Sequence, residues 1–95
     1  MPNFATLDLH SGYIWWSGEA DTPVDACVMS HACTGGYHST EWAAVSRSDA
    51  NTGSGYAVYR IPETMALDDG RDADTIEAVT ACPLAGYFQR TSSEA

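Results

Sequence analysis

Residues 4–25, FATLDLHSGYIWWSGEADTPVD, decide how the first part of this chain folds. Side-chain character alternates along residues 4–10, residues 13–17 are strongly aromatic, and Ser11-Gly12 separates the two runs. Because glycine takes a positive φ without steric cost, this two-residue connection predicts a β-hairpin. The alternation leaves two inward-facing sets open, Leu7 and Leu9 or Phe4 and Thr6, with Trp15 or Trp16 opposite.

The end of the same stretch predicts the start of a helix. Thr22 has the side chain of an N-cap, Pro23 stands where a missing N–H costs nothing, and Asp25 can close a capping box. Gly35-Gly36 then stops the helix. These signals predict one helix of about ten residues.

The rest of the chain predicts two more strands, a second short helix and a last strand. Residues 40–46 and 55–61 have the composition of strands, and the polar segment SDANTGSG between them predicts a second hairpin with a long tip. Asp74 begins a capping signal for a helix that runs to Cys82 and ends at Pro83. Residues 86–90 predict the last strand.

The resulting order, ββαββαβ, predicts an α+β fold. A mostly antiparallel sheet of four to five strands carries two short helices on one face, which makes a two-layer domain. The length and the absence of a linker predict a single domain over residues 1–95.

The densest group of reactive side chains lies in DACVMSHACTGGYH, residues 25–38. Zinc sites use four N or S ligands, and the spacing of Cys27, His31, Cys33 and His38 matches none of their usual patterns. On a helix, His31 points about 40° from Cys27 and Cys33 roughly 120° from it, so these ligands split between two faces. No cation or helix N-terminus activates a thiol. We interpret the segment as a scaffold helix with Cys27 and Val28 packed inward, without metal or cofactor. Its core stripe is Val24, Cys27, Val28, His31 and Ala32.

Charge is the most unusual property of the chain. Thirteen Asp and Glu stand against four Arg and no Lys, which gives a formal net charge of −9. Such a surface repels nucleic acid and anionic membranes and attracts basic proteins by long-range steering. Tyr and Trp side chains that face away from the helices suit a protein-binding surface and would permit a homodimer. Three cysteines cannot all pair in one chain, and no leader or membrane-spanning run is present, so we expect a soluble cytoplasmic protein.

Two stretches concentrate the acidic residues, SGEADTPVD (17–25) and LDDGRDAD (67–74). The second lacks the D-x-D-x-D-G order of a calcium loop. With its small size and its Lys-free, Ala/Gly/Asp/Trp-rich composition, the chain resembles the small acidic proteins encoded by phages and mobile elements of GC-rich bacteria, such as anti-CRISPR proteins.

This resemblance implies a non-catalytic inhibitor in the cytoplasm of a bacterial host cell. Its carboxylates would imitate DNA phosphates and block a Lys/Arg-lined groove of a CRISPR effector complex. The residues expected to contribute are Asp68, Asp69, Asp72, Asp74, Glu77, Glu19, Asp21 and Asp25.

Two other hypotheses follow from the residues. The first is an acidic accessory domain that binds a different basic protein, unrelated to defence. The second is a small metal- or thiol-dependent enzyme built on the cysteine and histidine cluster, which has the weaker support because of its spacing.

Overall fold

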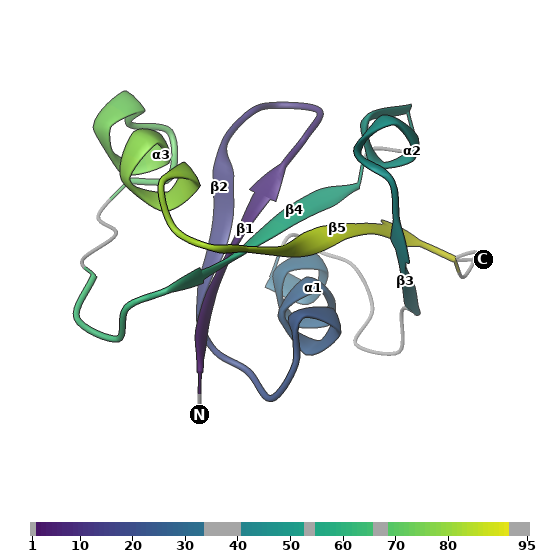
Figure 1. Ribbon diagram of the computed structural model, residues 1–95, viewed down its shortest axis with the longest axis horizontal. Coiled ribbons are helices and arrows are strands. Elements are labelled where there is room, and N and C mark those ends of the chain that lie inside the picture. The colour runs from purple at the N-terminus through teal and green to yellow at the C-terminus, as the bar shows by residue number, and fades with distance from the viewer. Residues whose placement is uncertain (1, 34–40, 53–54, 66–68, 92–95) are drawn as a thin grey trace.

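The computed structural model describes residues 2–33, 41–52, 55–65 and 69–91. Within them five strands and three helices alternate along the chain (Figure 1). In order they are β1 (Asn3–Asp8), β2 (Ile14–Glu19), α1 (Pro23–Cys33), β3 (Trp42–Val45), α2 (Arg47–Thr52), β4 (Tyr56–Ile61), α3 (Ala73–Thr80) and β5 (Leu84–Arg90).

The strands form one sheet in the order β2-β1-β4-β5-β3, and every pairing is antiparallel. The α+β class and the mostly antiparallel sheet expected from the sequence are therefore confirmed. β1, β4 and β5 lie inside the sheet, whereas β2 and β3 form its two edges.

The first hairpin forms, but its connection is the five-residue segment 9–13 and not the two residues Ser11-Gly12, because β1 already ends at Asp8. The first helix forms as expected as far as Cys33, and the predicted Gly35-Gly36 stop lies outside the described residues. The Gly12 N–H donates to Asp8 O at 2.8 Å, and Gly12 takes a φ of 79° that favours glycine. The Thr22 side chain caps α1, because its Oγ1 accepts the Asp25 N–H at 3.1 Å. Local signals in the sequence thus determine this part of the fold.

The inward face of β1 is the set containing Phe4 and Thr6. Both side chains are buried against α1, and the Thr6 hydroxyl donates to Ser30 Oγ at 2.8 Å. Trp16 lies opposite Thr6 in the register and packs on the same face. The core cluster on this side comprises Phe4, Ala20, Ala26, Cys27, Tyr56, Val58 and Phe88.

Side chains on the other face of β1 pack against α3. Ala5 is fully buried there with Val79, and Leu7 is half-buried beside them. Because successive strand residues point to opposite faces, α1 and α3 lie on opposite faces of the sheet. The sequence predicts two layers with both helices on one face, whereas the structure has α1 on one face and α3 on the other. The reason is that both faces of β1 carry side chains that are buried or half-buried in the fold, Phe4 and Thr6 on one and Ala5 and Leu7 on the other, so each face requires a cover.

The region between β3 and β4 departs furthest from expectation. The predicted second hairpin is wrong, since β5 lies between β3 and β4 and pairs with both. The segment expected as a polar tip contains helix α2, so the structure adds a third helix. Ser46 Oγ accepts the Asp49 N–H at 3.1 Å as a helix cap, and Ala50 anchors the helix in the core.

The second predicted capping signal is displaced by two residues. The N-cap of α3 is Asp72, whose carboxylate accepts the Thr75 N–H at 3.3 Å, whereas Asp74 lies in the first helical turn. Across the described part of the chain, no helix has the length and apolar character needed to cross a membrane.

Candidate protein-binding surface

Four of the predicted partner-binding carboxylates gather at the start of α3. We call Asp69, Asp72, Asp74 and Glu77 the α3 acidic group; all four are exposed. Asp69 also orders the turn before the helix, because its Oδ1 accepts the Arg71 backbone N–H at 2.9 Å. This N–H holds the pKa of Asp69 below its ordinary value, with a smaller contribution from the Arg71 guanidinium. Asp68 lies outside the described residues.

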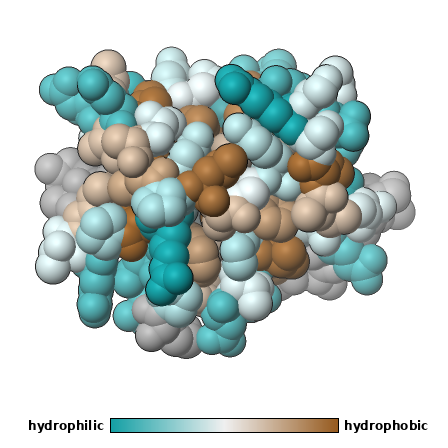
Figure 2. Space-filling model, viewed as in Figure 1, coloured by the Kyte–Doolittle hydropathy of each residue, from teal (hydrophilic) through white to brown (hydrophobic). Residues whose placement is uncertain are grey.

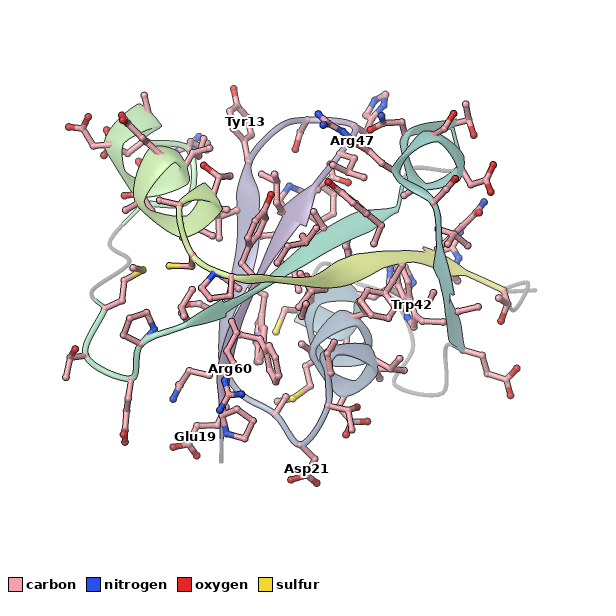
Figure 3. All side chains as sticks on the ribbon, viewed as in Figure 1. Tyr13, Glu19, Asp21, Trp42, Arg47 and Arg60 are labelled. Atoms are coloured by element: carbon pink, nitrogen blue, oxygen red, sulfur yellow. The ribbon has the colours of Figure 1, made fainter. Side chains whose placement is uncertain are left out.

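Three further carboxylates lie where β2 leads into α1. We call Glu19, Asp21 and Asp25 the β2–α1 acidic group; they too are exposed. Figure 3 labels Glu19 and Asp21 at the end of the molecule remote from α3. The predicted site residues therefore divide into two groups rather than one continuous patch.

Strand β2 sets the separation of the two groups. At its first residue, the Ile14 N–H donates to Gly70 O at 2.8 Å, which fixes the α3 acidic group beside that end. Glu19 is the last residue of the strand. Five residue steps at ~3.3 Å each separate these ends by roughly 16 Å.

The remaining described carboxylates are exposed, with one exception. Asp8 is buried, and its Oδ2 accepts the Ser11 N–H at 2.9 Å within the β1–β2 turn. Arg71 lies 3.6 Å from Asp69 as an exposed ion pair, which contributes little to stability. The acidic side chains thus remain available to a partner over most of the described surface.

Apolar and aromatic side chains also reach the surface. Figure 2 shows a band of hydrophobic side chains across the middle of the α3 face, where β5 runs, and Leu84 of β5 is 45% exposed. Trp15 is 40% exposed at the β2 edge. By contrast, Trp42 stacks on buried Tyr56 with ring centroids 4.9 Å apart, so these rings belong to the core.

A hollow of about 310 Å³ lies beside the β2 edge. Its lining comes from β2, from Cys33 at the end of α1, and from Gly70 before α3. The sequence alone does not predict this hollow. The pair Trp15-Trp16 is the feature of the sequence that points to it. The register of β2 is irregular opposite Thr6 and Leu7, where Trp15 is an extra residue in the strand.

The cysteine and histidine cluster takes the conformation of a structural helix. Cys27 is fully buried, and burial raises the pKa of its thiol to about 12. The His31 ring packs edge-on against Trp42, and its Nε2 accepts from the Arg90 guanidinium at 3.1 Å, since arginine can only donate.

The packing of α1 refines the predicted core stripe. Cys27 faces inward as expected, but the fully buried residues beside it are Ala26 and Ser30, whereas Val28 is only half-buried. Small side chains let α1 approach the sheet closely. Among the described residues, no three His, Cys, Asp or Glu side chains converge as a metal site would require, and His38 lies outside them.

Comparison with known proteins returns no relative. No protein-family model matches the chain, and no curated protein or solved structure is significantly similar to it.

Proposed function

We propose that this chain is a non-catalytic inhibitor whose acidic surface occupies a basic DNA-binding groove of a CRISPR effector complex. The observation that carries the proposal is a net charge of −9 whose described carboxylates, except Asp8, are exposed on a small sheet-based scaffold. Such a surface is steered towards Lys- and Arg-lined clefts.

The spacing of the acidic groups supports DNA mimicry. In B-DNA two rows of phosphates flank a major groove ~12 Å wide. The two ends of β2, beside which Asp69 and Glu19 lie, are roughly 16 Å apart, a distance of the same order. A groove that accommodates a duplex could therefore contact both groups at once.

The buried state of Cys27 supports a non-catalytic role. A thiol whose pKa is about 12 holds its proton at neutral pH, and only the thiolate is a nucleophile. His31 uses its Nε2 lone pair to accept from Arg90, so it does not act as a base towards Cys27 through that atom.

The test is a pull-down of a purified CRISPR effector complex with the tagged protein, in competition with double-stranded DNA at several salt concentrations. We expect DNA to displace the protein and salt to weaken binding, because both surfaces exchange counterions. Binding that leaves the effector able to hold DNA would refute the mimicry.

A matched pair of variants tests which carboxylates take part. Asp74→Asn with Glu77→Gln removes two charges from the α3 acidic group without touching the Asp72 cap. We expect it to weaken binding about fivefold, from about 0.5 kcal/mol per exposed charge. Asp49→Asn with Glu63→Gln removes the same charge elsewhere and serves as the control. Equal affinity for both variants would contradict the assigned surface.

A second candidate uses the same acidic surface for a different basic protein, as an accessory domain unrelated to defence. The exposed carboxylates support both functions equally, since neither depends on a reaction. Crosslinking of the intact protein in host cells, followed by mass spectrometry, separates them. Recovery of a basic protein outside CRISPR complexes, lost in the Asp74→Asn/Glu77→Gln variant, would favour the accessory role.

A further inference from the structure

We infer that the open edge of β2 binds an extended, basic segment of a protein partner as an additional strand. This inference rests on the proposed function, because that function supplies a basic protein as the partner. It adds the mode of recognition: main-chain pairing in the middle and charge pairing at both ends.

The backbone of β2 offers hydrogen-bonding groups on its outer side. The Ala20 N–H donates inward to Pro2 O at 3.2 Å, whereas the Ile14 N–H points outward to Gly70 O. Trp15 is an extra residue in β2 and reverses the alternation before it, so the direction is counted from Ala20. Backbone direction alternates along residues 16–20, and the backbone groups of Ser17 and Glu19 therefore face the open edge. No backbone hydrogen bond from another element reaches these two residues within the described chain.

At its first residue, the outer edge of β2 is already hydrogen-bonded to another segment of the protein, at Gly70. Gly70 approaches Ile14 so closely that a Cβ at Gly70 would clash with Ile14 O. A second strand would continue from this contact towards Glu19. The hollow of about 310 Å³ beside residues 14–17 gives room for one of its side chains against Trp15 and Cys33.

Charge selects the chemistry of that segment. Asp69 and Asp72 lie on either side of Gly70-Arg71 at one end of the edge and exceed the single positive charge of Arg71, and Glu19 and Asp21 lie at the other end. The ends are roughly 16 Å apart, which corresponds to five steps of an extended chain. A segment with Arg or Lys at both ends and β-branched residues between them fits this pattern.

The opposite edge of the sheet lacks these properties. β3 has four residues, compared with six in β2. Arg47 lies two residues beyond its last residue, and Arg90 lies opposite its first residue, an end that it shares with Glu41. These arginines make the β3 edge less acidic than the β2 edge, which disfavours a basic segment there. We therefore assign the basic segment to the edge of β2.

The experiment uses two labelled peptides and the intact protein. The first is acetyl-Arg-Val-Thr-Val-Thr-Arg-amide, and the second is the same peptide N-methylated at its four internal amides, which keeps the charge but removes the donors. We expect the methylated peptide to bind at least about tenfold more weakly by fluorescence anisotropy. We also expect the unmethylated peptide to slow amide hydrogen exchange at Ser17 and Glu19.

Variants of Ser17 locate the contact. Ser17→Pro removes the outward N–H at an edge position where proline is tolerated, and we expect it to abolish the preference for the unmethylated peptide. Ser17→Lys retains the backbone and repels the basic peptide, so it provides the same test if the proline variant does not fold. Ser17→Ala is the matched control and should bind like the parent.

Three results would overturn the inference. Equal affinity for both peptides would mean recognition by charge alone, which leaves the proposed acidic surface intact. Binding unaffected by Ser17→Lys would place the segment elsewhere. Failure of both peptides to bind would refute edge pairing, while the effector pull-down tests the proposed function independently.

Discussion

The buried hydrogen bond between Thr6 and Ser30 joins the centre of the sheet to α1. Both side chains are fully buried, and their hydroxyl oxygens lie 2.8 Å apart. Ser30→Ala removes the acceptor and leaves the Thr6 O–H without it. Thr6→Val removes the donor with almost no change of shape. Each variant therefore breaks the same contact from a different side.

The size of each effect follows from burial. A buried polar group that loses its partner costs about 1–3 kcal/mol, and we expect each single variant to lose this much unfolding free energy. Replacing both hydroxyls with apolar groups removes both desolvation penalties, so the double variant should lie within about 1 kcal/mol of the parent. The two changes are thus strongly non-additive.

Urea denaturation of the four proteins measures this coupling as a double-mutant cycle. We expect a coupling free energy of at least about 1 kcal/mol, with unchanged m-values. Additive losses, with the double variant the least stable protein, would refute the direct pairing of the two hydroxyls. Circular dichroism of each variant would verify that the native fold is retained.

Three further predictions concern stability. Gly70→Ala should cost about 2–4 kcal/mol in urea denaturation, since its Cβ would clash with Ile14 O and the adjoining hydrogen bond would be lost. Burial raises the pKa of Cys27 from 9.0 to about 12, so its contribution to stability is complete below pH 9 and is lost as the pH rises towards 12. The stability profile of Cys27→Ala over this range should therefore be flatter than that of the parent. Asp72→Ala should lower stability by about 1 kcal/mol in thermal denaturation, and Asp74→Ala by only a few tenths, because Asp72 is the N-cap.

Features encoded by neighbouring residues could be predicted from the sequence. The first hairpin and the Thr22 cap each depend on contacts within a few positions, and both form, although the hairpin connection spans residues 9–13 and not Ser11-Gly12 alone. The α+β class follows from the alternation of such segments. By contrast, α2 was overlooked because Ser46 and the polar residues after it also suit a loop, and only the burial of Ala50 distinguishes the helix.

Long-range pairing could not be read from the sequence. Ala44 lies opposite Phe88 in the sheet, and the residues around Ala44 do not indicate which strand it pairs with. The same limit applies to the surface. The sequence locates the acidic residues in two stretches, but their separation depends on the contact of Gly70 with Ile14, which appears only in the folded chain.

The position of β5 between β4 and β3 also has a consequence for the timing of folding during synthesis. β3 is complete at Val45, yet its partner strand ends at Arg90. At ~5–20 residues per second, translation of the intervening chain takes roughly 2–9 s. For this interval Trp42–Val45 lacks its native partner strand, so β3 joins the sheet only after β5 has been made. A nascent chain that stalls before Leu84 would carry both the β3 segment and the open side of β4 as sites for chaperones.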